Sequence, residues 1–288
     1  MSMISRLVLL VAVVAVSVVA TPVSHADQHE KAVLVTGARS GIGLAIAKDL
    51  AANGFFVYAG ARKAEDLAAL NEIENVQSVR LDVTVQEDID NAVQTVIDGG
   101  RGLFGVVNNA GVGVLATATE MPEEDLHFTF NVNVLGPYRV TKAFAPLIIE
   151  SQGRITTIGS ISGILSGRTS ASYSMSKHAV EAYTDSLALE MADHGVAVSV
   201  VEPGNYQSRI RYKVVEDAKA KGVSGEQLEG LEEWANTEWK EPIEVAFAVR
   251  QFLVEENPGR RYMVVPVADE ADITIRKIIM EMVELNQN

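Results

Sequence analysis

Apolar residues from position 31 onward fall in short runs rich in Val and Ile, which alternate with longer stretches of helical periodicity. The short runs lack polar–apolar alternation, which is typical of parallel strands covered on both faces. We expect strands at 32–36, 55–60, 76–81, 103–108, 154–159, 197–202 and 261–265. We expect helices at 41–53, 65–73, 85–98, 123–150, 171–194 and 242–255. The pattern predicts a single α/β domain: a doubly wound, seven-stranded parallel sheet with helices on both faces.

The segment 204–241 interrupts this alternation, because it carries no strand pattern and is rich in Lys and Glu. Its apolar residues include Leu228, Leu231 and Trp234, whose spacing predicts helix. Two interpretations stay open. The segment is either a lid that binds substrate or a solvated helix pair that only covers the edge of the sheet.

The first 26 residues differ from the rest of the chain. Arg6 precedes an apolar run at 7–20, and Ser24-His25-Ala26 is a small-x-small pattern suited to signal peptidase. The run is shorter than the roughly 20 residues that span a bilayer. We expect residues 1–26 to be a cleaved export signal and the catalytic domain, 27–288, to be periplasmic or secreted. The alternative is an uncleaved segment that anchors the chain in a membrane.

Composition narrows the classes of function. The 288 residues carry a formal charge of −14, which leaves no basic surface for nucleic acid. The chain has no cysteine, which excludes disulfides, thiolate metal sites and catalytic thiols. We expect a small-molecule substrate, no nucleic acid and no metal site.

A glycine-rich turn follows the first predicted strand and opens the first predicted helix. In that context it is typical of a dinucleotide-binding, Rossmann-type fold, because backbone N–H groups and the helix N-terminus face the pyrophosphate. The candidate cofactor-binding residues here are Gly37, Arg39, Ser40, Gly41, Ile42 and Gly43.

Cofactor choice is expected to depend on the end of the second strand, where NAD enzymes carry a carboxylate for the ribose hydroxyls. This chain has Ala61 followed by Arg62, with Arg39 as a possible second cation. Charge-assisted bonds to a 2′-phosphate favour NADP(H) over NAD(H).

Two further strand ends supply candidate cofactor-binding residues. Asp82, with Val83 after it, is placed to accept from the adenine amino group, although an N-cap role for Asp82 or Thr84 is an alternative. Asn109, Ala110 and Gly111 follow the fourth strand, where ligands bind in open α/β sheets. Asn109 has a second interpretation, pairing with strand-end backbone groups.

The candidate catalytic residues are Ser160, Tyr173 and Lys177. Ser160 directly follows the fifth strand, and Tyr173 and Lys177 are four apart in a predicted helix, so they share a face. An adjacent ammonium favours the phenolate of a tyrosine whose ordinary pKa is about 10. Tyr173 then exchanges a proton with a carbonyl oxygen while a nicotinamide exchanges hydride, and Ser160 holds the same oxygen. Asn133 either binds a water that relays protons to Lys177 or bonds to backbone.

Assembled, these residues resemble the short-chain dehydrogenase/reductase family over 31–262. The resemblance rests on Thr36-Gly-x-x-x-Gly-x-Gly43, Asn108-Asn-Ala-Gly111, Asn133, Ser160, Tyr173-x-x-x-Lys177 and Pro203-Gly204. It implies a catalytic tetrad of Asn133, Ser160, Tyr173 and Lys177 with NAD(P). Further stretches at 58–62 and 133–138 are similar to the branch of retinol and 17β-hydroxysteroid dehydrogenases.

The resemblance also implies roles for Pro203, Gly204 and Ser208 in cofactor binding, with Ser208 where many members have Thr, and a homodimer or homotetramer. We expect a hydrophobic carbonyl or secondary alcohol, retinoid-, steroid- or small-ketone-like, in a pocket bounded by 112–115, 161–165, Tyr206 and the 204–241 segment. Two alternatives are a non-catalytic nucleotide-binding sensor or scaffold, and an epimerase or dehydratase that retains its cofactor.

Overall fold

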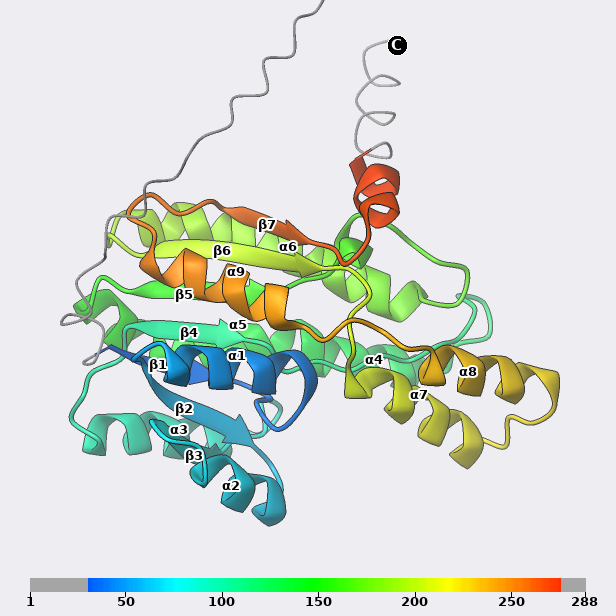
Figure 1. Ribbon diagram of the computed structural model, residues 1–288, viewed down its shortest axis with the longest axis horizontal. Coiled ribbons are helices and arrows are strands. Elements are labelled where there is room, and N and C mark those ends of the chain that lie inside the picture. The colour runs from blue at the N-terminus through cyan, green and yellow to red at the C-terminus, as the bar shows by residue number, and fades with distance from the viewer. Residues whose placement is uncertain (1–30, 276–288) are drawn as a thin grey trace, which may run out of the picture.

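The structure, a computed structural model, describes residues 31–275. Seven parallel strands form one sheet in the order β3-β2-β1-β4-β5-β6-β7 (Figure 1). The strands are β1 (Ala32–Val35), β2 (Phe56–Ala61), β3 (Val76–Arg80), β4 (Gly105–Asn108), β5 (Arg154–Ile158), β6 (Ala197–Pro203) and β7 (Arg261–Val264). The predicted doubly wound sheet is confirmed, and the order reverses between β1 and β4, where such sheets bind ligands.

Helices cover both faces of the sheet. They are α1 (Gly41–Ala52), α2 (Ala64–Asn71), α3 (Gln86–Asp98), α4 (Glu123–Asn133), α5 (Leu135–Glu150), α6 (Ala171–Ala192), α7 (Arg209–Ala220), α8 (Glu226–Asn236) and α9 (Ile243–Val254), with a 3₁₀ turn η2 (Ile161–Gly163). Residues 268–275 are also helical. In Figure 1, α1 and α9 lie side by side in front of the sheet, and they contact each other.

The core consists of two apolar layers separated by the sheet. One layer joins Ile46 of α1 and Val249 of α9 to the strands. The other joins Phe144 of α5 and Leu187 of α6 to the opposite face. Because both faces are covered, the strand residues of β1 are all buried, which explains their unbroken apolar run.

The predicted helix at 123–150 is wrong as a single element, because the structure breaks it at Val134 into α4 and α5. Pro137 lies in the first turn of α5 and has no N–H to donate to the carbonyl of Asn133 four residues earlier. The Asn133 side chain also bonds the backbone of Val112 outside the helix. Both features end α4 at Asn133 and place it beside the loop after β4.

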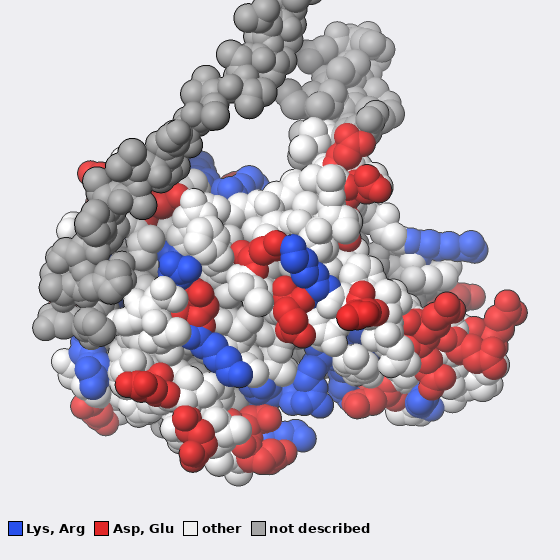
Figure 2. All heavy atoms as spheres, viewed as in Figure 1, with Lys and Arg blue, Asp and Glu red and all other residues white. Residues whose placement is uncertain are grey.

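The 204–241 segment forms the helix pair α7 and α8, as predicted, and this pair projects beyond the carboxyl edge of the sheet (Figure 1). Arg211 joins the two helices: it is buried, its guanidinium stacks on Trp239 at 4.8 Å and Trp234 at 6.0 Å, and it donates to the carbonyls of Trp234 and Thr237. Acidic side chains gather over α8 (Figure 2), which carries Glu226, Glu229, Glu232 and Glu233.

The predicted export signal at 1–26 lies outside the described residues. Within 31–275, the structure contains no helix that is long and apolar enough to cross a membrane.

Candidate active site

The parallel strands bring the predicted site residues to one edge of the sheet. The glycine turn after β1, the turn after β4, Ser160 after β5 and Gly204 after β6 all follow carboxyl ends of neighbouring strands. The register pairs Asn108 of β4 with Thr157 of β5, so the next turns leave the sheet side by side. Residues separated by more than 100 positions in the chain therefore share one crevice.

The glycine turn is tightly built. Gly37 has φ +65°, and a Cβ there would lie 3.0 Å from Ala110 Cα. A Cβ at Gly43 would overlap both Asn109 Nδ2 and the Gly37 carbonyl oxygen. Only glycine fits at these two positions, so the turn after β1 and the turn after β4 pack directly against each other.

Asn109 holds the glycine turn in place. Its side-chain amide donates to the carbonyl oxygens of Thr36 at 2.9 Å and Gly37 at 3.2 Å, and its backbone N–H donates to Thr36 Oγ1. This is the alternative interpretation of Asn109, as a group that pairs strand-end backbone. Ala110 and Gly111 follow it at the same edge, and Gly111 lies close to Asn133.

The N-terminus of α1 fits a phosphate group. Ser40 is the N-cap residue, and its side chain caps no backbone N–H. The first N–H groups of a helix have no intrahelical partner and carry the positive end of its dipole. The turn from Gly37 to Gly43 therefore presents uncapped donors, including those of Gly41 and Ile42, at the carboxyl edge.

The two candidate cations of the cofactor site both lie beside carboxylates. Arg39 is 3.7 Å from Asp66, and Arg62, which is largely exposed, is 3.4 Å from Asp82. Asp82 also accepts from the N–H and hydroxyl of Thr84. Burial opposes ionisation of Asp82, but the Thr84 bonds and the Arg62 charge hold its pKa below the ordinary value.

The N-cap role considered for Asp82 or Thr84 is wrong, because α3 begins after Val85, which supplies no side-chain cap. Asp82 instead stabilises the 82–84 turn. Val83 is buried, and its side chain lies against the position that a Cβ at Gly136 would occupy, so it packs in the core. A cofactor contact of Val83 would therefore involve its backbone.

Ser160, Tyr173 and Lys177 are brought together as predicted. Ser160 is buried and caps η2, and its Oγ accepts from Ser162 N at 3.0 Å. Ser160 lies near enough to the Tyr173 hydroxyl to favour the phenolate and so lower the Tyr173 pKa. The Lys177 Nζ is 5.6 Å from the centre of the Tyr173 ring and donates to the carbonyl of Ile158 at 2.7 Å. The triplet thus lies at the end of β5 beneath the first turns of α6.

The electrostatics of the triplet differ from the sequence expectation. Burial raises the pKa of Tyr173, and the nearby Ser160 offsets this only in part. Burial also lowers the pKa of Lys177 to about 8, against the attraction of Glu181. In this structure the ammonium bonds a carbonyl rather than the phenol, so Tyr173 stays protonated at neutral pH.

Asn133 is buried, and its side chain bonds within the protein. Its Oδ1 accepts from Val112 N at 2.8 Å, and its Nδ2 donates to Val112 O at 2.9 Å and Ser176 Oγ at 3.0 Å. The amide protons are fully used, which favours the alternative of a backbone-bonding amide. The backbone carbonyl oxygen of Asn133 receives no hydrogen bond from Pro137, which has no N–H. This oxygen is therefore the group of Asn133 that is available to a water.

The last predicted cofactor residues lie opposite the glycine turn. The backbone of Ser208 lies within 3.3 Å of the position that a Cβ at Gly41 would take. Pro203 ends β6, and Gly204 packs against Glu270, whose carboxylate accepts from the N–H and side chain of Asn205. Glu270 was not expected from the sequence, because its contact depends on where the C-terminal helix packs.

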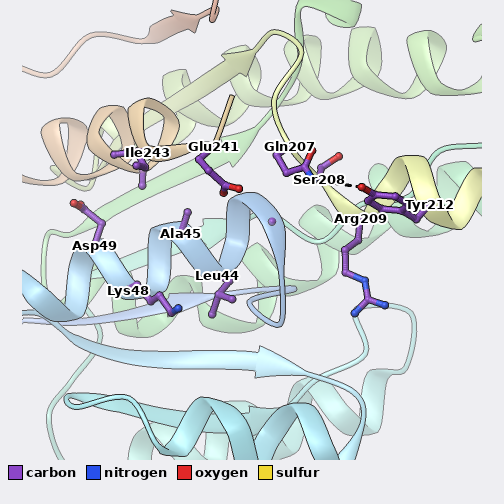
Figure 3. Close-up of a pocket in the computed structure, with 12 residues that line it drawn as sticks. Leu44, Ala45, Lys48, Asp49, Gln207, Ser208, Arg209, Tyr212, Glu241 and Ile243 are labelled. Atoms are coloured by element: carbon purple, nitrogen blue, oxygen red, sulfur yellow. Dashed lines mark hydrogen bonds between the residues drawn. The ribbon is translucent and has the colours of Figure 1, made fainter. Parts of the chain in front are cut away.

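Arg209 is a second residue that sequence reasoning missed. It is exposed, it follows Ser208, and its backbone N lies 3.7 Å from a Cβ position at Gly41. Figure 3 shows its side chain extending from the start of α7. The sequence feature that could have identified Arg209 is its position next to Ser208. This position brings a cation to the uncapped N-terminus of α1.

Part of the predicted pocket boundary lies near Tyr173. A Cβ at Gly113 would lie 3.0 Å from Ile210 and 3.9 Å from Tyr173 and Val214, so apolar side chains of α7 and the Tyr173 ring both lie against Gly113. Tyr206 is not part of this boundary. It is buried in the core, and its hydroxyl donates to Glu244 of α9 at 2.6 Å.

A cavity of about 550 Å³ lies on the outer side of α1 (Figure 3). Its lining includes Lys48 and Asp49 of α1, Ser208 and Tyr212, and Glu241. It touches the candidate cofactor site through Gly41 and Ser208 but includes none of Ser160, Tyr173 and Lys177. Among the described residues, no group of His, Asp and Glu is arranged to hold a metal ion.

The fold and site together define a nucleotide-dependent oxidoreductase: a dinucleotide turn and a Ser–Tyr–Lys triplet face one crevice of a doubly wound sheet. Comparisons with known proteins agree. The family model described as short chain dehydrogenase matches residues 31–219. The mitochondrial D-beta-hydroxybutyrate dehydrogenase of Rattus norvegicus is 33% identical over 271 residues, covering 84% of this chain and 79% of the rat protein.

Other relatives and structures extend the match. Retinol dehydrogenase 7 of Mus musculus is 36% identical over 192 residues, covering 65% of this chain but only 60% of the mouse protein. A short-chain dehydrogenase of Streptomyces avermitilis superposes with TM-score 0.75 at 29% identity, over 89% of this chain and 96% of that one. L-sorbose reductase of Gluconobacter frateurii, solved with NADPH and L-sorbose, gives TM-score 0.70 at 25% identity, over 82% and 95%.

The chain belongs to the short-chain dehydrogenase/reductase family, in the branch similar to retinol dehydrogenases. It is an oxidoreductase of the alcohol–carbonyl couple that uses a nicotinamide dinucleotide.

Proposed function

We propose that this enzyme is NADP(H)-dependent and interconverts a hydrophobic carbonyl compound and its secondary alcohol. The observation that carries the proposal is the placement of Tyr173 between Ser160 and Lys177, beside apolar side chains of α7. The nicotinamide, when bound, supplies or accepts the hydride. The chain's own residues bind the carbonyl oxygen and move one proton.

Tyr173 is the proton donor in carbonyl reduction. Because burial raises its pKa, the phenol is protonated at neutral pH and can donate to the carbonyl oxygen. Ser160 orients the same oxygen: its Oγ accepts from Ser162 N, which leaves its own proton free to donate. Lys177 favours the phenolate that remains after transfer, since its ammonium lies close to the ring.

The preference for NADP(H) is supported by charge. Arg39 and Arg62 lie at the glycine turn and at the end of β2, and each faces a carboxylate at 3.4–3.7 Å in a long, weak ion pair. A 2′-phosphate is dianionic and accepts bidentate bonds from guanidinium, so it competes well with these carboxylates. Position 61 is Ala, so the end of β2 itself carries no acid to repel the phosphate.

The hydrophobic substrate is supported by the apolar side chains beside Tyr173. Ile210 and Val214 of α7 face Gly113 beside the catalytic ring. Their apolar surface favours a retinoid-, steroid- or small-ketone-like ligand over a strongly charged one.

Calorimetric titration of residues 27–288 with NADP⁺ and NAD⁺ tests the cofactor. Arg62→Ala is expected to weaken NADP⁺ binding by about 10–100-fold, the usual value of a bond to a charged group, and NAD⁺ binding by less than about twofold. Lys63→Ala removes the same charge one residue away, where Lys63 pairs with Glu65, and is the matched control. Equal loss of both cofactors in Arg62→Ala would contradict the proposed 2′-phosphate contact.

Turnover is tested with Tyr173→Phe, which retains the aromatic ring and removes the hydroxyl group that donates the proton. We expect unchanged NADP⁺ affinity and a loss of carbonyl reduction by about 10²–10⁴-fold. A Tyr173→Phe enzyme that still reduces carbonyl substrates at the wild-type rate would exclude Tyr173 as the donor. A wild-type protein that binds NADP⁺ but reduces no member of a panel of retinal, steroids and ketones would favour the alternative function, a non-catalytic nucleotide-binding sensor or scaffold.

We also propose that residues 1–26 direct export, on the sequence pattern alone. Cell fractionation with N-terminal sequencing of the mature protein tests this. A first residue at Asp27 in the exported fraction supports cleavage, and an intact N-terminus in the membrane fraction supports the anchor.

A further inference from the structure

Behind the catalytic triplet lies a pair of buried carboxyl groups that the proposed reaction does not use. Glu181 is one helical turn after Lys177 on α6 and is 8% exposed, and Glu202, near the end of β6, is 2% exposed. Helix α6 packs against both β6 and η2, which brings the pair under the loop that carries Ser160. Buried carboxylates are costly unless paired, so this arrangement requires an explanation.

One arginine serves both carboxyl groups. Arg261, at the start of β7, forms ion pairs through Nη1 with Glu181 and, at 3.2 Å, with Glu202. Its Nη2 bonds Asp185 of α6 at 2.8 Å, and Asp185 also faces Arg260. A single guanidinium cannot neutralise both buried acids, so the pair holds a proton. Burial and the charge of Glu202 raise the pKa of Glu181 to about 7, and burial raises that of Glu202.

The free oxygen of Glu181 faces the Ser160 loop. Its Oε1 is buried and has no hydrogen-bond partner in the described part of the chain. It lies 2.9 Å from the Cβ positions that side chains at Gly159 and Gly163 would occupy. These two glycines flank Ser160 and η2, so the carboxyl group supports the loop from beneath and requires glycine at both positions.

Glu181 also lies on the same face of α6 as Lys177, four residues after it, and both residues are buried. The Lys177 ammonium is buried and bonds the Ile158 carbonyl, directly before Gly159. Burial disfavours its charge, and the attraction of Glu181 opposes this. Above about pH 7, where Glu181 is ionised, it is the anion that offsets burial of Lys177.

We propose that Glu181 is a positioning residue of the active site, which keeps Lys177 charged and supports the Ser160 loop through its shared carboxyl pair with Glu202 and Arg261. The inference rests on the proposed function in that it assigns a purpose to the charge of Lys177. Glu181 touches neither substrate nor cofactor and acts through Lys177.

The test is the titration of Lys177 itself in Glu181→Gln, which keeps the size of the side chain and removes its charge. Protein labelled with ¹³C at the lysine ε-carbon is followed by NMR from pH 6 to 11, with the Lys177 signal assigned by its loss in Lys177→Arg. We expect the pKa of Lys177 to fall by about one unit or more, the usual effect of a neighbouring opposite charge. The basic limb of the pH profile of NADPH-dependent carbonyl reduction moves to lower pH by the same amount.

Two variants control for structural damage. Asp185→Asn removes an acid that contacts Arg261 from the exposed side, and it is expected to leave the Lys177 titration unchanged. Glu202→Gln leaves Glu181 as the sole buried partner of Arg261, which favours the charged Glu181, so the pKa of Lys177 is expected to stay or rise. A general loss of packing would change the pKa of Lys177 in the same way in both variants. It would not lower this pKa in Glu181→Gln while leaving it unchanged or raised in Glu202→Gln.

An unchanged Lys177 titration in folded Glu181→Gln overturns the proposal, and so does a fall of equal size in Glu202→Gln. If Glu181→Gln does not fold, the Glu202→Gln variant decides. A lowered pKa of Lys177 in this variant overturns the proposal, and an unchanged or raised pKa of Lys177 supports it. Failure of the proposed function gives a different result. The wild type would then turn over no carbonyl substrate, while the NMR shifts of Lys177 would remain as expected.

Discussion

Gly43 shows how little space separates the residues of the cofactor turn. A Cβ at this position would overlap the Asn109 side chain and the Gly37 carbonyl, which hydrogen bond to each other. Neither partner can move without breaking the brace between β1 and β4. Gly43 therefore matters for its lack of a side chain, and its position in the first turn of α1 places it in the candidate cofactor turn.

We predict that Gly43→Ala lowers the stability of the protein by about 1–3 kcal/mol, the usual cost of overpacking, and weakens binding of NADP⁺ and NAD⁺ together. Gly230→Ala is the matched control, because a Cβ in this helical position of α8 meets no atom within 4 Å. It is expected to stabilise by about 0.5–1 kcal/mol. Thermal unfolding and calorimetry measure both effects, and a Gly43→Ala protein with wild-type stability would show that the turn yields.

At the residue scale, spacing alone was sufficient to predict that Ser160, Tyr173 and Lys177 lie together. Tyr173 and Lys177 share a helical face, and Ser160 follows a strand of a parallel sheet, so local geometry determines where each lies. Tyr206 was assigned wrongly, because the direction of its ring toward Glu244 depends on how α9 packs. Arg209 was missed for a similar reason, since its proximity to Gly41 follows from the tertiary position of α7.

Among the elements, strand and helix periods predicted the sheet, while the break between α4 and α5 was missed. The proline at 137 is tolerated in a first turn, so it looked compatible with one long helix, but its missing N–H and the Asn133 bonds to Val112 end α4. Alternation and helical period report burial within one element. They do not report a side chain that leaves its helix to bond a distant loop.

The α7–α8 pair is joined by Arg211, and the structure offers an optical probe of this junction. The chain has two tryptophans, Trp234 and Trp239, and both rings lie on the Arg211 guanidinium. We predict that Arg211→Ala loosens α7 from α8 and shifts tryptophan fluorescence to longer wavelength. The midpoint of thermal unfolding followed by circular dichroism is expected to change by only about 2–4 °C, because the sheet core is not touched.

Because Ile210 and Val214 of α7 lie against Gly113, beside Tyr173, the same variant is expected to raise the KM for a hydrophobic carbonyl more than it lowers kcat. Lys213→Ala on the exposed side of α7, where Lys213 pairs with Asp217, is the control and should leave both fluorescence and KM unchanged. An Arg211→Ala enzyme with wild-type fluorescence and KM would mean that α7 is held by other contacts.

For the whole molecule, the buried carboxyl pair makes stability depend on pH. The pKa of Glu181 is raised to about 7, whereas an unfolded glutamate titrates near about 4.3. Between these values the folded protein retains a proton that the unfolded chain releases. The contribution of Glu181 is therefore full below about pH 4 and is lost as the pH rises through about 7.

We predict that Glu181→Gln, which cannot ionise, reduces the loss of stability between pH 5 and pH 8 by about 1–3 kcal/mol relative to wild type. Denaturant unfolding at the two pH values measures this difference. Lys177 has the opposite sign at higher pH: its pKa is lowered to about 8, so its contribution grows as the pH rises from about 8 to 10. An identical pH dependence in wild type and variant would show that the carboxyl pair is already ionised in the folded state.

The exposed apolar residues of α4, α5 and α6 predict a surface for self-association. Four of these side chains are 44–51% exposed, namely Phe128, Leu135, Tyr138 and Met175, and Leu189 is 71% exposed. The three helices are neighbours, because α4 contacts both α5 and α6. Large apolar side chains on neighbouring helices are typical of a subunit interface. We predict that the wild type sediments as a dimer or tetramer and that Leu135→Glu with Tyr138→Glu shifts it toward monomer. Ile97→Glu, an equally exposed apolar site on α3, should not, and a wild-type monomer at micromolar concentration would contradict the interface.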